Sequence, residues 1–207
     1  MGYYPIFLEM KGRRCVVIGG GTVAERKVQG LLQAGANVTL ISRTITEPLG
    51  ILAEAGKIAR MARPYQPGDL AGCQLIFVAT DDAAVTAAVK READRLGVLM
   101  NAADDPAQCD FILPSVLRRG DLAVAVGTGG SSPALSKAIR EELEAYFTED
   151  YAALARIAAE VRRELREQGR SAGPEIWDRA LNGDVRKLIQ QGDIEGAKRY
   201  LRGQMGA

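Results

Sequence analysis

Short apolar runs alternate with helix-forming segments through the first half of the chain. Four of these runs are rich in β-branched residues and contain few polar side chains: residues 15–18, 37–41, 75–79 and 98–101. Such runs are typical of strands buried on both faces of a parallel sheet. The segments between them predict helices over residues 22–34, 46–56 and 83–96, and a short extra strand over 57–61. The alternation therefore predicts an α/β fold, a Rossmann-type doubly wound parallel sheet.

The alternation stops after about residue 110. Residues 111–117 and 122–126 are strand-like, and residues 118–121 between them have the composition of a hairpin turn. A helix is expected from Pro133 to about residue 147, because proline after serines is a good helix start. Only helical patterns follow, over residues 154–168, 175–181 and 184–204.

We therefore expect three parts in the chain. A Rossmann domain occupies residues 1–113, a small α+β dimerisation region residues 114–147, and a helical tail domain residues 148–207. The hairpin strands of the middle part lack the helices that would cover a second face, so we expect them to pack against a partner surface.

A glycine-rich loop follows the first strand. Gly19, Gly21 and Ala24 fit the pattern G-x-G-x-x-A, in which the first glycine turns the chain and the second lets the backbone approach a pyrophosphate. The next helix would direct its free N–H groups at the phosphates, and Thr22 adds a hydroxyl donor. The expected cofactor contacts here are Gly19, Gly20, Gly21, Thr22 and Val23. The alternative is a tight strand-to-helix turn without a ligand.

The ends of the second and third strands carry further candidate contacts. Sites for NAD usually have an acidic residue after the second strand, but Arg43 and Thr44 stand there. Arg43 would suit the 2′-phosphate of NADP, or it is an ordinary exposed arginine, and its position alone leaves both open. Thr80 and Asp81 follow the third strand and would reach the same crevice, whereas Asp82 is expected to cap the next helix.

Composition excludes several other classes of function. The 207 residues contain 27 Lys and Arg against 26 Asp and Glu, a net charge of +1, so no nucleic-acid footprint is present. The three cysteines, Cys15, Cys73 and Cys109, have no metal-site spacing, and we interpret them as small buried apolar side chains. No run approaches the length of a membrane span, and we expect a cytoplasmic protein without a metal site.

Several motifs, taken in order, resemble one known family. They are YPIF at 4–7, VIGGGTVAERK at 17–27, ATDD at 79–82, NAAD at 101–104, FILP at 111–114 and GGSSP at 129–133. The chain resembles the precorrin-2 dehydrogenases, which include the amino-terminal module of siroheme synthase and a bifunctional yeast enzyme. The resemblance covers residues 1 to about 147, and the tail matches only in kind.

This resemblance implies a function and its partners. The activity would be NAD-dependent oxidation of precorrin-2 to sirohydrochlorin in siroheme biosynthesis, in some members followed by insertion of ferrous iron. NAD would be the cofactor although Arg43 stands where an acid is usual. The protein would be a homodimer whose middle strands and helix exchange between subunits.

The same resemblance points to a catalytic residue and a substrate loop. Oxidation needs a base, the chain has no histidine, and the family's proposed catalytic aspartate falls on Asp104. From the residues alone, Asp104 could equally belong to an ordinary Asp-Asp-Pro turn. The glycine loop before Pro133 offers backbone donors to the carboxylates of precorrin-2 through Thr128, Gly129, Gly130 and Ser131.

Two alternatives to this enzyme remain open. Regulatory modules share the same first βαβ unit and bind NAD(P) without turning it over, and a different NADP-dependent reductase would use the same loop.

Overall fold

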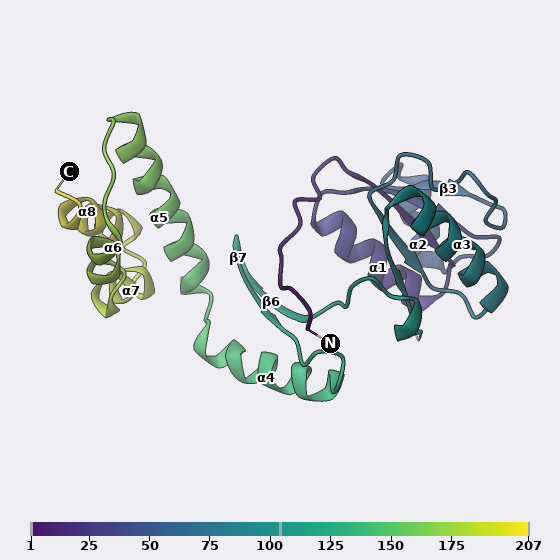
Figure 1. The fold of residues 1–207 in the computed structure, drawn as a ribbon. Helices are drawn as coiled ribbons and strands as arrows, with labels where there is room; N and C mark the ends of the chain where they lie inside the picture. Colours follow the sequence, from purple (N-terminus) through teal and green to yellow (C-terminus); the bar gives the residue numbers. More distant parts are fainter. Residues whose placement is uncertain (1, 104, 207) are drawn as a thin grey trace. The chain divides into compact units, whose positions relative to one another are not determined.

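The computed structural model describes residues 2–103 and 105–206. The chain divides into two compact units, Met1–Ile112 and Leu113–Ala207, and each is described by itself. Figure 1 shows their helices and strands along the chain.

A five-stranded parallel sheet forms the centre of the first unit. Its strands are β1 (Arg14–Ile18), β2 (Asn37–Ile41), β3 (Ala59–Met61), β4 (Leu75–Val78) and β5 (Leu99–Ala102), in the spatial order β3-β2-β1-β4-β5. Ile18 is in register with Ile41 on one side and with Val78 on the other. The carboxyl ends of neighbouring strands therefore meet at one edge of the sheet. This topology confirms the predicted doubly wound fold.

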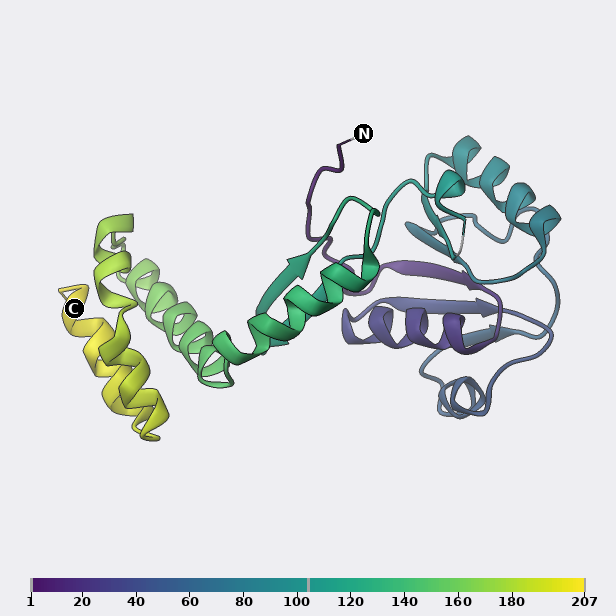
Figure 2. The same cartoon turned by 90° about the horizontal axis from the view of Figure 1, so that it is seen from below.

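Helices cover both faces of this sheet (Figure 2). Helices α1 (Thr22–Gln33) and α2 (Glu47–Glu54) bury apolar side chains against one face, and α3 (Ala83–Leu96) packs on the other. Alternation along β1 supplies both cores, because Val17 joins the first and Val16 the second. A short 3-10 helix, η1 (Pro106–Gln108), follows β5.

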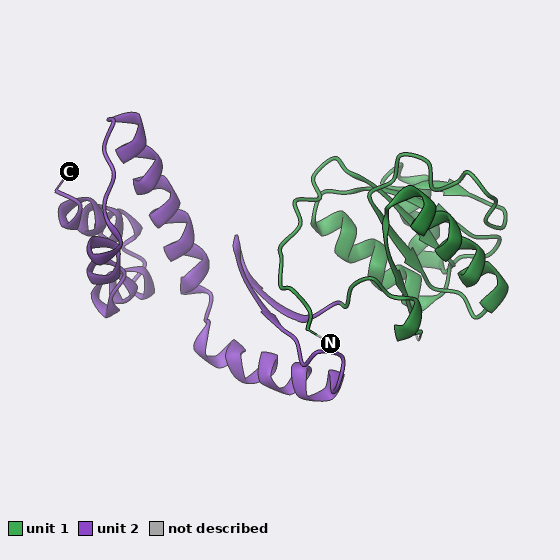
Figure 3. Ribbon diagram, viewed as in Figure 1, with its two compact units in different colours: residues 1–112 green, residues 113–207 purple. Residues whose placement is uncertain are grey.

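The second unit combines a hairpin with helices (Figure 3). Strands β6 (Ser115–Arg119) and β7 (Leu122–Val126) pair antiparallel, and α4 (Pro133–Tyr146) packs against them. The remaining helices are α5 (Asp150–Glu167), α6 (Pro174–Ala180), α7 (Gly183–Gln190) and α8 (Ile194–Gln204). They share a core of buried side chains, including Ile157 and Leu201.

The prediction of a strand over residues 111–117 is wrong at its start. The strand begins at Ser115, and Pro114 just before it has no N–H to donate to a ladder. Phe111 instead packs edge to face on Phe77 of β4, with ring centroids 5.6 Å apart. The Phe111 ring therefore belongs to the core of the first unit and not to the hairpin.

Further boundaries also differ from the predictions, and α5, for example, begins at Asp150 instead of residue 154. The hairpin turn is shorter than expected, because Arg119 pairs with Leu122 and only two residues connect the strands. The helical segment over 184–204 is divided between α7 and α8, where Gly192 adopts a φ of 80° and the Asp193 side chain accepts a hydrogen bond from Gly196 N.

Candidate functional site

The turn between β1 and α1 depends on glycine at its first position. Gly19 has a φ of 112°, and a Cβ there would lie 1.9 Å from the carbonyl oxygen of Ala79, just after β4. Its N–H donates to the carbonyl of Ile41 at the end of β2. Gly19 therefore lies where the ends of β1, β2 and β4 meet at the crevice of the sheet.

The next two glycines serve different purposes. A Cβ on Gly20 would lie 2.0 Å from the carbonyl oxygen of Thr44, and the Gly20 carbonyl accepts from Thr46 N at 2.9 Å. The loop after β2 is therefore held against the glycine turn. Around Gly21, by contrast, no described atom beyond its chain neighbours lies within 4 Å of the Cβ position. This open face fits the close approach of a dinucleotide pyrophosphate.

The start of α1 has free donors for that pyrophosphate. Its N-cap is Gly21, and among the described residues no side chain caps the helix. At the start of α3, by comparison, the Asp82 carboxylate accepts from Ala84 N at 2.9 Å and Val85 N at 3.1 Å, which confirms the predicted cap. The start of α1 therefore keeps N–H groups free for an anion, and there Thr22 is exposed and Val23 half-buried.

The loop after β2 presents Arg43 and Thr44 to solvent. The Ser42 hydroxyl donates to the Thr44 carbonyl at 2.7 Å, and Arg60 Nη2 of β3 donates to the Arg43 carbonyl at 3.1 Å. Sequence reasoning missed Arg60, because only the pairing of β2 with β3 brings it here. Two guanidinium groups consequently accompany this loop.

Thr80 and Asp81 follow Ala79, the residue that contacts Gly19. Thr80 is half-buried and its hydroxyl oxygen accepts from Asp82 N at 3.3 Å, while Asp81 is exposed. The structure thus brings the glycine loop, the Arg43 loop and the Thr80 loop to one edge of the sheet.

The loop after β5 carries the predicted catalytic residue Asp104, which lies outside the described residues. Cys109 packs on this loop: its thiol can donate to the carbonyl of Ala102 at 3.1 Å or of Asp105 at 3.3 Å, and its sulfur accepts from Ala102 N at 3.2 Å. Burial raises the pKa of the Cys109 thiol. Our interpretation of Cys109 as a small buried apolar side chain is confirmed only in part, because it packs half-buried against the core while its sulfur also contacts the backbone of this loop.

The other two cysteines are fully buried and free. Burial and then the neighbouring Cys73 thiol raise the pKa of Cys15 to about 11. Among residues 2–103 and 105–206, no group of three or more side chains of metal-binding type comes together. No helix in the described part of the chain is long and apolar enough to cross a bilayer.

The second glycine loop belongs to the second unit. The Thr128 hydroxyl donates to the Ser132 carbonyl at 2.9 Å and lies 3.1 Å from the Ser136 hydroxyl. Ser131 donates to the Thr128 carbonyl at 2.5 Å. Thr128 therefore shapes the loop internally. Gly129 and Gly130 have φ values of 63° and 83°, and their Cβ positions face open space, which leaves the backbone accessible.

Most basic residues near this loop already have partners. Arg140 pairs with Glu141 and Glu144, and Lys137 lies 3.7 Å from Glu141. Arg119 lies away from this loop, at the turn of the hairpin, where it donates to the Phe147 carbonyl at 2.7 Å and pairs with Glu149 at 3.2 Å.

Comparisons with known proteins match two successive parts of the chain. A family model described as putative NAD(P)-binding matches residues 6–115, and one described as sirohaem biosynthesis protein, central, matches residues 119–146. A siroheme synthase of Methylococcus capsulatus is 41% identical over 97% of this chain, and one of Nitrosococcus oceani is 39% identical over 97%. A solved structure described as SirC, precorrin-2 dehydrogenase, has a TM-score of 0.74, 28% identity and 99% coverage of both chains.

The coverage of the two kinds of relative differs. The chain spans 43% of the length of each of these two siroheme synthases. It spans nearly the whole length of the solved structure.

Proposed function

The chain belongs to the family described as putative NAD(P)-binding, and from this premise and its similarity to siroheme synthases and a precorrin-2 dehydrogenase we propose that it oxidises precorrin-2 to sirohydrochlorin with NAD. The observation that carries the proposal is the open face of Gly21 at the uncapped start of α1, at the crevice between the ends of β1 and β4. This is where a doubly wound sheet binds a dinucleotide.

Bound NAD would supply the acceptor for the hydride. The backbone N–H groups of Thr22 and Val23 would hold its pyrophosphate, and Gly21 would admit it without a steric clash. Arg43 and Thr44 would lie on the adenosine side, and Thr80 and Asp81 would flank the crevice after β4.

Oxidation of precorrin-2 also releases a proton, which requires a base near the reacting atoms. We propose the Asp104 carboxylate for this role, since the chain has no histidine and the loop after β5 starts at the cofactor edge of the sheet. The fixed neighbours of this loop support the assignment, because Cys109 holds both Ala102 and Asp105.

We propose the second glycine loop as the site for substrate carboxylates. The backbone N–H groups of the exposed residues Gly129 and Gly130 suit an anion, and Ser131 lies beside them, with its own N–H donating to the Thr128 carbonyl at 3.1 Å. The Thr128 hydroxyl fixes the shape of the loop.

The proposal includes a homodimer. The hairpin β6–β7 is covered by α4, while Val116 and Leu113 remain 37% and 50% exposed. A second copy would bury such apolar surface. Sedimentation velocity should give a dimer at micromolar concentration, and a monomer with full activity would contradict this.

In the proposed insertion step, ferrous iron would enter as a substrate. The reaction belongs in the cytoplasm under this proposal, where Cys15, Cys73 and Cys109 stay reduced.

One spectroscopic assay tests the proposal. Protein, NAD and precorrin-2 are mixed, and we expect reduced nicotinamide and sirohydrochlorin to form in equal amounts. A regulatory module would bind NAD and leave both spectra unchanged, and an NADP-dependent reductase would turn over a different substrate. Addition of ferrous iron to the product mixture then reports insertion through the spectrum of siroheme.

A further inference from the structure

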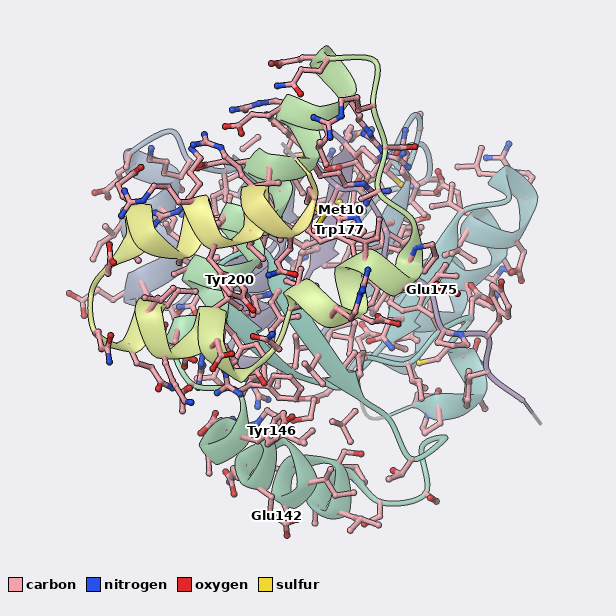
Figure 4. The ribbon with its side chains drawn as sticks, turned by 90° about the vertical axis from the view of Figure 1, so that its left-hand side faces the viewer. Met10, Glu142, Tyr146, Glu175, Trp177 and Tyr200 are labelled. Atoms are coloured by element: carbon pink, nitrogen blue, oxygen red, sulfur yellow. The ribbon has the colours of Figure 1, made fainter. Side chains whose placement is uncertain are left out.

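The helical tail contains a groove of about 780 Å³ along α5. Its floor is made of small or apolar side chains: Ala155, Ala158 and Ala159 of α5, with Pro174, Trp177 and Leu181 opposite. Figure 4 shows Trp177 on α6. A groove of this volume falls in the range of small-molecule sites.

The lining of this groove is strongly basic. Four arginines border it, Arg162, Arg163, Arg166 and Arg170, and none of its lining residues is acidic. Two carboxylates of α5 pair with α8 instead, Glu160 with Lys198 and Glu164 with Arg202, while Glu167 lies 3.8 Å from Arg163. The whole chain has a net charge of only +1, so the basic lining of this groove is a local feature.

Two of these arginines have no partner in the described part of the chain. No carboxylate lies within 4 Å of the guanidinium of Arg162 or Arg166, and neither donates a hydrogen bond there. They stand one helical turn apart, a spacing at which like charges disfavour a helix. By contrast, Arg163 reaches Glu167 at 3.8 Å, and Arg170 donates to the carbonyls of Met205 and Gly206.

We propose that this arginine groove binds a polycarboxylated tetrapyrrole. The planar body of such a ligand would lie over the alanine floor against Trp177, since an indole ring favours flat apolar faces. Its peripheral carboxylates would accept paired hydrogen bonds from Arg162 and Arg166. The anionic and planar character of the ligand follows from the groove, and its identity as a tetrapyrrole rests on the proposed function. The groove would hold substrate or product on a surface separate from the cofactor loop.

The test is a titration of the full chain with uroporphyrin, a planar tetrapyrrole carrying many carboxylates. Binding is followed by the Soret absorbance and by the fluorescence of Trp177, the single tryptophan of the chain. We expect Arg162→Ala and Arg166→Ala each to weaken one binding step about 10-fold or more, the scale of one charge-assisted hydrogen bond. The matched control, Arg199→Ala, removes the same charge from an exposed position on α8 outside the groove and should change the affinity less than about 2-fold.

A second variant tests the groove without changing its charge. Ala158→Phe fills the floor and should block the same binding step while the far-UV spectrum and melting temperature stay as in the wild type. Unchanged affinity in both the arginine variants and Ala158→Phe would overturn the proposal. Loss of self-association in the arginine variants, with uroporphyrin affinity retained, would also overturn it and assign the groove to a second copy.

The two proposals fail separately in these experiments. If uroporphyrin binding depends on Arg162 and Arg166 but the protein does not oxidise precorrin-2, the groove proposal stands and the proposed function is refuted. If the protein oxidises precorrin-2 at full rate but the groove variants bind uroporphyrin as the wild type does, the proposed function stands and the groove proposal is refuted.

Discussion

The Cys109 sulfur and the backbone of Ala102 contact each other twice: Ala102 N donates to the sulfur at 3.2 Å, and the thiol lies 3.1 Å from the Ala102 carbonyl oxygen. Ala102 is the last residue of β5, so this contact fixes where the chain leaves the sheet. Asp110 also links this segment to β5 and α3, because its carboxylate accepts hydrogen bonds from Met100 N at 2.9 Å and from Lys90 Nζ at 2.6 Å.

We predict that Cys109→Ala lowers kcat by about 10- to 100-fold, because small misplacements of a reacting group have effects of this size. The free energy of unfolding should fall by about 1 kcal/mol for the lost hydrogen bond. Cys109→Ser keeps a donor and an acceptor and should restore most of the activity. Steady-state kinetics and NAD titration measure this, and an equal loss of NAD affinity would show that the sulfur acts on the whole edge of the sheet.

Substitutions of Gly19 and Gly21 in the first loop should distinguish an effect on stability from an effect on NAD binding. Gly19→Ala should destabilise the protein by about 3 kcal/mol or more, because its Cβ would collide with the Ala79 carbonyl at a positive φ. Gly21→Ala should change stability by less than about 0.5 kcal/mol and still weaken NAD binding, since its methyl group occupies the open face. Gly21→Asp should abolish binding by adding charge repulsion. Urea unfolding and NAD titration test this, and unchanged NAD affinity in Gly21→Asp would refute the nucleotide site.

The first βαβ unit could be predicted from sequence because its determinants are local. The apolar run after Arg14, the glycine turn and Gly35 after the helix all act within a few residues, and the predicted strand over 37–41 coincides with β2. The strand over 122–126 likewise coincides with β7.

The errors and omissions depend on contacts between distant residues. Phe111 continues an apolar run into β6 in sequence, but its ring belongs to the core beside Phe77. Arg60 comes to the Arg43 loop only through the register of β2 and β3, and the role of Cys109 depends on a chain reversal after η1. Nothing in residue type or local spacing distinguishes these residues from ordinary ones.

Cofactor preference is a further prediction. We expect kcat/KM to be at least about 10-fold higher with NAD than with NADP, a difference of about 1.4 kcal/mol in transition-state binding. The resemblance to precorrin-2 dehydrogenases implies NAD, although Arg43 and Arg60 accompany the loop after β2. Kinetics with both cofactors decide the question. A preference for NADP that Arg43→Ala removes would mean that this guanidinium binds a 2′-phosphate.

The tail should lose an electrostatic contribution in acid. Arg202 donates to both carboxylate oxygens of Glu164 at 2.8 Å, and this holds the pKa of Glu164 at about 2, below its ordinary value of 4.5. Because the pKa of Glu164 is lower in the folded than in the unfolded state, its ionised carboxylate stabilises the folded protein at pH values above the unfolded pKa of 4.5. This contribution is lost as the pH falls from 4.5 towards 2.

The melting temperature of Glu164→Gln should therefore lie below that of the wild type at neutral pH, and the gap should close across this acidic range. Thermal melts by circular dichroism at low salt measure it, with Glu167→Gln as the control at an exposed position 3.8 Å from its partner Arg163. A gap independent of pH would show that the pair contributes through packing alone.

The mechanism is tested most directly at Asp104. If this carboxylate is the base, Asp104→Asn should lower kcat by about 100-fold or more while melting temperature and NAD affinity stay unchanged, because the amide is nearly isosteric but cannot take a proton. Asp105→Asn is the matched control in the same loop, and since it keeps the backbone carbonyl that Cys109 contacts, it should have a much smaller effect. Iron insertion measured on the same variants reveals whether both reactions use the residue. Oxidation at the wild-type rate in Asp104→Asn would mean that solvent or another carboxylate, such as Asp81, removes the proton.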